Sequence, residues 1–176
     1  MRIQVDEERV DALTGRIQQM TVEEDLEPPV PVGEELPEMM QAFALRPDIV
    51  DAMLPLQRIL YLEGQIDREL LDKLFVRVSR LNECQFCTAA HTAALNRVGI
   101  DDSPATDREA VALDYAEQVT EDANRVGDTL FARLQEQFTD EEIIELTLAI
   151  GLISLLNKFN NALNIRYENP TSTDDR

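Results

Sequence analysis

The sequence predicts an all-α protein. From Glu38 almost to the end of the chain, apolar residues recur at intervals of three and four, which is the spacing of one helix face. No stretch alternates between apolar and polar residues as a half-buried strand does, and no glycine-rich phosphate loop is present. Capping residues, prolines and glycines divide the apolar pattern into segments of ordinary helix length.

The first expected helix covers residues 5–20. Its apolar side chains fall on one stripe, formed by Val10, Leu13, Ile17 and Met20. Residues 21–37 carry four prolines and a run of acids, which predicts an extended linker. We therefore expect residues 1–37 to be an N-terminal helical arm that packs on the main domain or on a neighbouring subunit.

Residues 38–166 are expected to form one helical domain, and 167–176 a flexible tail. Pro47 can start a helix, Gly64 can stop one, and Asp67 and Thr139 or Asp140 are suitable caps. The helices that we expect in this domain are 39–45, 47–63, 67–82, 84–99, 107–125, 128–138 and 140–165.

A faint internal similarity appears when the chain is shifted by 73 residues. ELLD at 69–72 then lies over EIIE at 142–145, and CQFCTAAH at 84–91 lies over NKFNNALN at 157–164. Cys84, Cys87 and His91 thereby meet three asparagines, namely Asn157, Asn160 and Asn164. If the similarity is real, the domain holds two degenerate helix-pair repeats, of which only the first keeps its reactive groups.

The chain of 176 residues has a net charge of −19. This charge repels nucleic acid and anionic membrane surfaces, so we expect neither as a partner. No apolar run is long enough to span a membrane and the first residues are polar and acidic, so we expect a cytoplasmic protein without a signal peptide. The acidity, with only two lysines, is typical of a salt-rich cytoplasm or of an acidic oligomer from ordinary conditions. Unfolding measured against KCl separates these two explanations.

Both cysteines and the only histidine lie within the stretch NECQFCTAAH, residues 82–91. On a helix, Cys84, Cys87 and His91 share one face, and Cys87 and His91 are close enough to touch. If the helix begins at Cys84, both sulfurs lie in its first turn, where free N–H groups and the helix dipole favour thiolate over thiol.

Three kinds of site fit these residues. A structural zinc site takes four Cys or His ligands, whereas the chain offers three, so we expect no metal. Two buried cysteines beside a hydrogen-bonded histidine would be purely structural. In a redox dithiol one cysteine attacks, the other closes a disulfide, and His91 manages the protons without a further cofactor. The CxxC spacing favours the dithiol, although the β-α-β context of a thioredoxin-like fold is absent.

The segment LLDKLFVRVSRLNECQFCTAAHTAAL resembles the core of the carboxymuconolactone decarboxylase-like family, specifically of its alkylhydroperoxidase D branch. That core has an acidic residue, eleven residues, CxxC, three residues and a histidine. Asp72, Cys84, Cys87 and His91 match all four positions. NRVGI, which follows, and the late LLNKFNNAL are similar to the family's peroxidase-related members.

The resemblance, which spans roughly residues 38–166, implies an alkylhydroperoxidase D-like helical fold that assembles into a homo-oligomer, a trimer or a hexamer. It implies a thiol-dependent peroxidase that reduces hydrogen peroxide or organic hydroperoxides. In that scheme Cys87 attacks the peroxide, His91 and Asp72 draw its proton away, and Cys84 closes the disulfide. An external dithiol or thioredoxin-like reductant then regenerates the two thiols.

The acidic position departs from the family, which usually has glutamate where this chain has Asp72. Aspartate is one methylene shorter, so a water is expected to bridge Asp72 to His91, or Glu69 or Glu83 to replace it. Alternatively, Asp72 is a solvated helix residue with no part in the site.

Two other functions remain open. A lactone decarboxylase of the same family would need a local basic pocket, for which Arg77, Arg80 and Arg97 are the candidates. A non-enzymatic redox sensor or oligomeric scaffold would form the disulfide once and then bind differently, whereas an enzyme would turn over.

Overall fold

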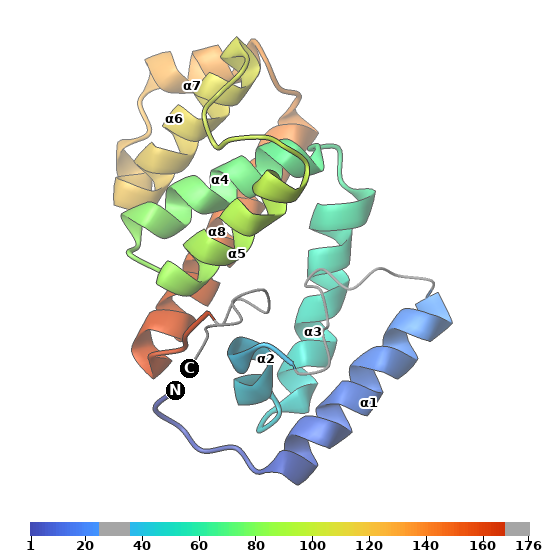
Figure 1. Ribbon diagram of the computed structural model, residues 1–176. Coiled ribbons are helices and arrows are strands. Elements are labelled where there is room, and N and C mark those ends of the chain that lie inside the picture. The colour runs from blue at the N-terminus through green and yellow to red at the C-terminus, as the bar shows by residue number, and fades with distance from the viewer. Residues whose placement is uncertain (25–35, 168–176) are drawn as a thin grey trace.

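The computed structural model describes residues 1–24 and 36–167, with side chains described for 1–18 and 36–167. Within these ranges all regular structure is helical, so the predicted all-α class is confirmed (Figure 1). The α-helices are α1 (Glu7–Glu24), α2 (Glu38–Phe43), α3 (Pro47–Arg58), α4 (Arg68–Leu81), α5 (Gln85–Arg97), α6 (Asp107–Asp122), α7 (Asp128–Gln135) and α8 (Asp140–Leu163). A π-helix, η1 (Ile59–Glu63), continues α3, and a 3-10 helix, η2 (Ala123–Arg125), continues α6.

Helix α4 is the central element, and α5, α6 and α8 all pack against it (Figure 1). The side chain of Asp67 caps its first turn by accepting the Leu70 N–H at 2.9 Å, as predicted. The apolar residues predicted from its periodicity are all buried, namely Leu70, Leu71, Leu74, Phe75 and Val78. Lys73 is also buried, because its ammonium group pairs with Glu109 of α6 at 2.7 Å.

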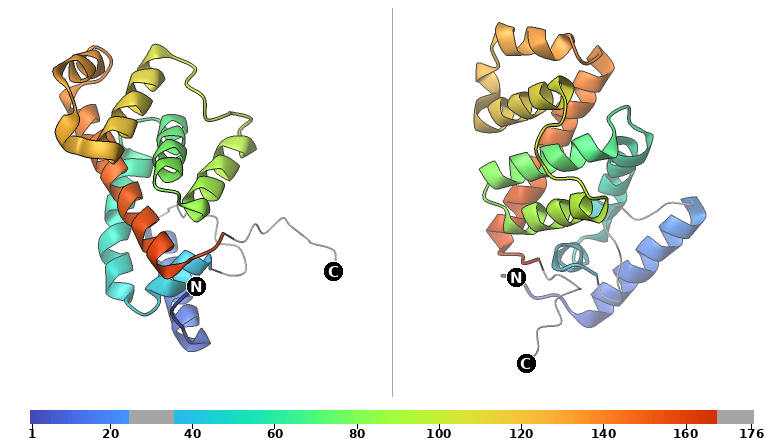
Figure 2. Two further views of the ribbon diagram at one scale, coloured as in Figure 1. Left: turned by 90° about the vertical axis from the view of Figure 1, so that its left-hand side faces the viewer. Right: turned by 45° about the horizontal axis from the view of Figure 1, so that its top comes forward.

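Helix α8 runs from the end of the molecule that holds α6 and α7 to the end that holds α2 (Figures 1 and 2). Its start is a reciprocal capping box, in which the Thr139 hydroxyl accepts the Glu142 N–H and the Glu142 carboxylate accepts the Thr139 N–H. It ends at Asn164, which adopts the left-handed conformation with φ 53°. This long helix therefore reaches both the core and the start of α5.

The chain turns sharply between α4 and α5. Glu83 has a positive φ of 54°, and the next residue, Cys84, is extended and serves as the N-cap of α5. The Cys84 N–H closes the turn by donating to the Ser79 carbonyl at 2.8 Å. The break predicted at residues 82–83 is thus present, and it places both cysteines at the start of α5.

The N-terminal arm packs on the rest of the chain. Leu13 and Ile17 of α1 are buried in the same apolar core as α4 and α8, and Arg16 pairs with Asp51 of α3. Helix α1 lies beside α3 in Figure 1. The expected linker is shorter than predicted, because α1 continues to Glu24. Residues 25–35 and 168–176, which include most of that linker and of the expected tail, lie outside the described residues.

The predicted pair of helix-pair repeats takes a different form. The 73-residue shift places α4, the turn and α5 over residues that belong to one uninterrupted helix, α8. The turn at Asn82–Cys84 corresponds to Leu155–Asn157, which remain helical. The similarity therefore does not reproduce the helix pair, although it does match two stretches that meet in space.

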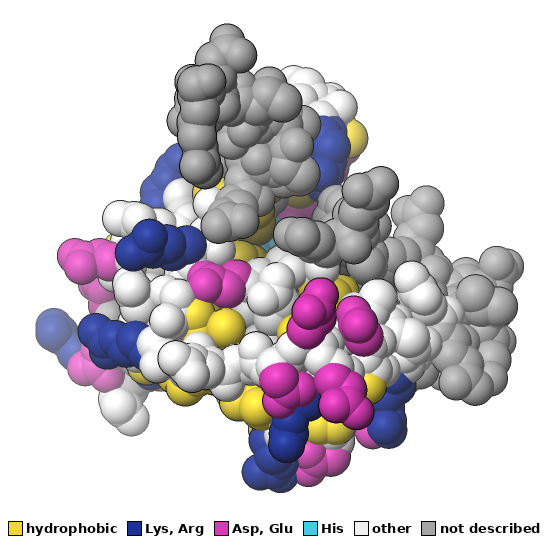
Figure 3. All heavy atoms as spheres, turned by 60° about the horizontal axis from the view of Figure 1, so that its bottom comes forward, with side chains coloured by type: hydrophobic (Ala, Val, Ile, Leu, Met, Phe, Trp, Pro, Cys, Tyr) yellow, Lys and Arg dark blue, Asp and Glu magenta, His cyan; other side chains and the backbone are white. Residues whose placement is uncertain are grey.

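The surface is mixed rather than uniformly acidic on the face that Figure 3 shows, where acidic and basic side chains surround exposed hydrophobic ones. Along α8, Ile144, Leu148 and Leu155 are at least half exposed. The predicted homo-oligomer stays a prediction. None of the described helices is long and apolar enough to cross a membrane.

Candidate functional site

The two cysteines lie together at the start of α5 as free thiols. Cys84 is the N-cap residue and Cys87 lies in the first turn, so both sulfurs are close to N–H groups that have no partner within the helix. Their exposed fractions are only 1% and 3%, respectively. Both cysteines therefore lie at a helix start, as expected, and both are almost completely shielded from solvent.

The surroundings of the two thiols shift their pKa values in opposite directions. The hydrogen bond from the Cys87 thiol, helped by the Cys87 N–H and two amides of α8, outweighs burial and lowers the pKa of Cys84 to about 6. The same hydrogen bond and burial raise the pKa of Cys87 above its ordinary value. The two thiols therefore titrate as a coupled pair, in which the lower pKa belongs to Cys84.

Asp72 and His91 form a direct hydrogen bond, in which Nδ1 of His91 lies 2.8 Å from Oδ1 of Asp72. The other carboxylate oxygen of Asp72 accepts from Nε of Arg68, also at 2.8 Å. Burial raises the pKa of Asp72, but the hydrogen bond and charge of His91, together with Arg68, lower it further than burial raises it. The carboxylate is therefore ionised and accepts a hydrogen bond from Nδ1–H, which leaves Nε2 of His91 as the free nitrogen.

The shorter aspartate thus reaches the histidine without a bridging water. Neither Glu69 nor Glu83 has a hydrogen bond to His91 within the described part of the chain, where the ring of His91 bonds only to Asp72. The helices α4 and α5 pack closely enough that one methylene less is accommodated. The alternative of a solvated Asp72 is wrong, because this side chain is buried.

A layer of aromatic rings lies against the histidine. The Phe75 and His91 rings are 4.9 Å apart, and Tyr61 of η1 lies 5.3 Å from Phe75. The guanidinium of Arg68 covers the Tyr61 ring at 4.4 Å. Burial raises the pKa of Tyr61, and the charges that act on this phenol include those of Arg68, Asp72 and Cys87. Sequence reasoning missed Tyr61, because the residue order does not mark the π-helix that holds it, a kind of helix frequent at functional sites.

Helix α8 supplies a second group that sequence reasoning missed. The side-chain amide of Asn160 donates to the sulfur of Cys87 at 3.2 Å, and both residues are buried. Asn157, one turn earlier, donates to the Ser79 hydroxyl and accepts from the Asn82 amide, both at 3.0 Å. These are the asparagines that the 73-residue shift pairs with Cys87 and Cys84. That shift was thus the one sequence signal that connected them.

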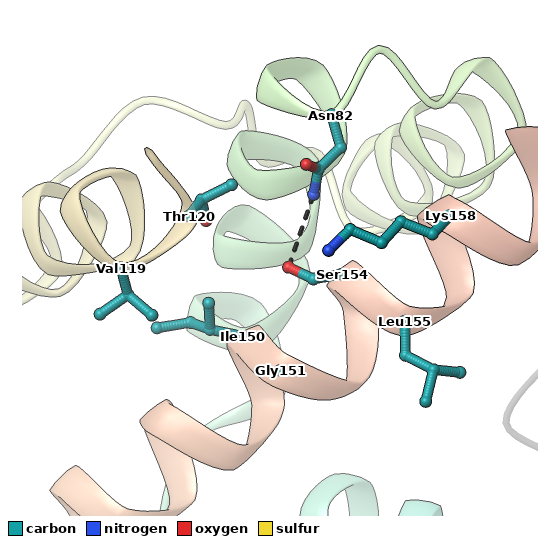
Figure 4. Close-up of a pocket in the computed structure, with 8 residues that line it drawn as sticks. All are labelled: Asn82, Val119, Thr120, Ile150, Gly151, Ser154, Leu155 and Lys158. Atoms are coloured by element: carbon teal, nitrogen blue, oxygen red, sulfur yellow. Dashed lines mark hydrogen bonds between the residues drawn. The ribbon is translucent and has the colours of Figure 1, made fainter. Parts of the chain in front are cut away.

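A hollow of about 860 Å³ opens beside the dithiol. Cys84 belongs to its wall, whereas Cys87 does not, and successive turns of α5 continue the wall with Thr88, Thr92 and Asn96. A second hollow, of about 490 Å³, lies between the end of α4, α6 and α8 (Figure 4). Asn82 lines this second hollow and also bonds to Asn157, so it links the hollow to the residues around the sulfurs.

Two features that other functions would require, a metal site and a basic pocket, can be checked in the described part of the chain. The described residues contain no group of three or more His, Cys, Asp or Glu side chains that is arranged to hold a metal ion. Arg77 pairs with Glu117 and Arg80 pairs with Asp102, so two of the three arginines proposed for a lactone pocket have their charge matched by an acid.

Comparisons with known proteins place this arrangement in a known fold. No family model matches the chain. It is 26% identical over 117 residues to the uncharacterized protein YdfG of Bacillus subtilis (strain 168), an alignment that covers 59% of this chain and 80% of YdfG. It is 33% identical over 101 residues to the uncharacterized protein YnjA of Escherichia coli (strain K12), covering 51% of this chain and 56% of YnjA.

Three solved structures share nearly the whole fold. An uncharacterized peroxidase-related protein from Silicibacter sp. TM1040 superposes with a TM-score of 0.76 and 19% identity, covering 95% of this chain and 90% of its own. The alkylhydroperoxidase AhpD core of a peroxidase-related protein from Ralstonia eutropha JMP134 gives a TM-score of 0.73, 24% identity and coverages of 96% and 92%. The debrominase Bmp8, as a cysteine-to-alanine variant in complex with 2,3,4-tribromopyrrole, gives a TM-score of 0.74, 16% identity and coverages of 96% of this chain and 91% of its own.

These superpositions confirm the predicted alkylhydroperoxidase D-like fold. They also show that proteins named for different chemistry, peroxidase-related or debrominase, share it. The chemistry of this chain must therefore be argued from its own site.

Proposed function

We propose that the protein is a thiol-dependent peroxidase that reduces hydrogen peroxide or organic hydroperoxides. The observation that carries this proposal is the buried pair of free thiols at the start of α5, beside the Asp72–His91 hydrogen bond. A peroxidase needs a thiolate near neutral pH, a second thiol within reach, and a group that moves protons. All three lie on α5 or on the adjoining face of α4.

The first step is attack on the peroxide by the Cys84 thiolate. The sulfur bonds to the terminal oxygen of the hydroperoxide and the O–O bond breaks, so the sulfur becomes a sulfenic acid. The departing alkoxide takes a proton from solvent and leaves as the alcohol. The lowered pKa of Cys84 and its place in the wall of the hollow support this residue as the attacking one.

The second step closes the disulfide. Cys87 loses its proton to the free Nε2 of His91, one helical turn further along α5, while Asp72 stabilises the protonated ring. The Cys87 thiolate then attacks the sulfur of Cys84, so an S–S bond forms and the S–O bond breaks. The hydroxide that leaves takes the proton from His91 and becomes water. An external dithiol or a thioredoxin-like reductant returns both sulfurs to thiols by exchange.

This order of events reverses the cysteine roles that the family resemblance implies, in which Cys87 attacks and Cys84 resolves. Both orders use the same four residues and give the same overall reaction. The sulfur that carries the sulfenic acid distinguishes them.

The test measures peroxide consumption with a dithiol reductant in the wild type, Cys84→Ser, Cys87→Ser and the double variant. We expect both single variants to lose turnover on the order of 10³-fold, because neither can complete the cycle. One equivalent of peroxide should leave a trappable sulfenic acid on Cys84 in Cys87→Ser. Turnover that persists in either single variant contradicts the proposal, and a sulfenic acid found only on Cys87 in Cys84→Ser restores the other order.

The same assay separates the remaining functions. A redox sensor consumes one equivalent of peroxide and then stops, even with reductant present. A debrominase reaction, suggested by the Bmp8 neighbour, would release bromide from a brominated pyrrole while peroxide remains unconsumed.

A further inference from the structure

The side of the dithiol that faces α8 is formed by amides. Asn160 is 1% exposed and its Nδ2 lies 3.2 Å from the sulfur of Cys87. Its Oδ1 is buried and has no hydrogen-bond partner among the described residues. A buried amide oxygen without a partner is costly, so its presence beside a reactive sulfur calls for an explanation.

The neighbouring amide differs because its orientation is locked. Asn157 donates to Ser79 and accepts from Asn82, whose backbone carbonyl is held in turn by the Asn161 amide at 2.8 Å. Both polar ends of Asn157 are therefore occupied by protein groups. Asn160 has one end on the sulfur and the other end free, so it can change its hydrogen bond without breaking another side-chain contact.

We infer that Asn160 is a positioning residue of the dithiol, whose Nδ2 donates to the pair of sulfurs while the pair carries a negative charge and whose Oδ1 accepts from the Cys87 S–H when both sulfurs are protonated. A rotation of the amide about its last side-chain bond exchanges the two ends, so one residue satisfies both protonation states. Because an amide does not titrate in this range, its stabilisation of the anion does not itself depend on pH. This inference deepens the proposed peroxidase function and rests on it.

The remaining groups around the sulfurs act from other sides. His91 and Asp72 belong to α5 and α4, and Tyr61, whose phenol feels the charge of Cys87, belongs to η1. From α8, the contacts that lower the thiol pKa values come from the two neutral amides, Asn160 and Asn157. A change at residue 160 therefore alters the thiols without altering any titratable neighbour.

The experiment follows the ultraviolet absorbance of the thiolate, and the rate of alkylation by iodoacetamide, as functions of pH. It compares the wild type with Asn160→Ala, Asn160→Asp and Asn161→Ala. The last variant is a matched control, since it loses an amide hydrogen bond of the same helix that does not touch sulfur. Thermal unfolding of each variant checks that the fold is retained, and Asn160→Asp is nearly isosteric should the alanine variant fail to fold.

We expect Asn160→Ala to raise the midpoint of thiolate formation by about one pH unit, which slows alkylation roughly tenfold below the midpoint. Asn160→Asp should raise it further, because its carboxylate repels the anion. Asn161→Ala should titrate as the wild type does. Unchanged midpoints in the folded residue-160 variants overturn the inference. Alkylation needs no peroxide, so the two hypotheses can fail separately. If the midpoint of thiolate formation shifts but the wild type consumes no peroxide, only the proposed function is contradicted. If the wild type is an active peroxidase but the midpoint does not shift in the residue-160 variants, only this inference is contradicted.

Discussion

Two stretches of the chain, residues 82–91 and 157–164, meet at the dithiol although 73 positions separate them. The first begins a short helix after a sharp turn and carries two thiols and an imidazole. The second ends a long uninterrupted helix and carries asparagines at the matching positions. At the three matching positions, the first stretch therefore holds groups that titrate and react, and the second holds amides that only donate and accept hydrogen bonds.

The difference shows how a helix start and a helix end serve different purposes at one site. The turn at Glu83 frees the N–H groups of α5 beside the sulfurs, and such groups stabilise an anion. At the end of α8 the backbone carbonyls of the last turn accept hydrogen bonds from Arg2, Asn164 and Ile165. The negative end of the helix dipole disfavours an anion there, so neutral amide side chains are suitable instead. Each stretch carries the side chains that its own helix terminus favours.

The largest expected effect on peroxide turnover is at His91, the imidazole of the first stretch. His91→Gln keeps a polar partner for Asp72 but removes the proton carrier, so peroxide turnover should fall by roughly 10²-fold or more. Asn164→Gly changes the matching position of α8 and keeps its left-handed backbone, so turnover should be that of the wild type. Steady-state peroxide consumption measures both. Equal losses in the two variants would contradict the division of roles between the stretches.

The pH dependence of the reaction should reflect the hydrogen bond from the Cys87 thiol, helped by the Cys87 N–H at the start of α5. Since the pKa of Cys84 is lowered to about 6, the thiolate predominates above this pH and is lost below it. The rate of the first attack should therefore be nearly constant above about pH 7 and fall about tenfold per unit well below pH 6. Rapid mixing with peroxide at several pH values measures this rate. A midpoint near that of an ordinary cysteine would contradict the stabilisation of the Cys84 thiolate by these hydrogen bonds.

The same 73-residue shift aligns two acidic residues, Asp72 and Glu145. A smaller effect on turnover is expected at Asp72, and none at Glu145. Asp72→Asn no longer fixes the tautomer of His91, so turnover should fall on the order of tenfold. Glu145, by contrast, accepts the N–H groups of Gln65 and Ile66. Glu145→Ala should cost about 1 kcal/mol of unfolding free energy and leave turnover unchanged. Peroxide assays and denaturant unfolding separate the two effects.

The stability of Asp72→Asn should also depend on pH in a defined direction. The pKa of Asp72 is lowered in the folded protein, so its carboxylate stabilises the fold above its ordinary value, about 4, and this contribution disappears as pH falls through the lowered value. The variant should therefore be less stable than the wild type at pH 7, and the gap should narrow in acid. A gap that stays constant with pH would show that the ion pair with Arg68 and the hydrogen bond with His91 contribute nothing to stability.

Most of the fold was predictable because its signals are local. Asp67 and Thr139 cap helices through hydrogen bonds to residues three positions away, and the apolar spacing of α4 identifies its buried face. The grouping of Cys84, Cys87 and His91 on one helix likewise follows from spacing alone. The continuation of α1 to Glu24 was missed because the acidic residues before the prolines resemble a linker as much as a helix end.

The remaining properties depend on contacts between helices, which residue order does not encode directly. The packing of α4 on α5 decided that Asp72 reaches His91 without a water, and that of α8 on α5 brought Asn160 to Cys87. The difference in pKa between the two thiols depends on hydrogen bonds from both helices and on burial, so the chain alone could not predict it. Local hydrogen bonds and periodicity thus determined the helices and the dithiol, whereas only tertiary packing decided how the dithiol is charged and supported.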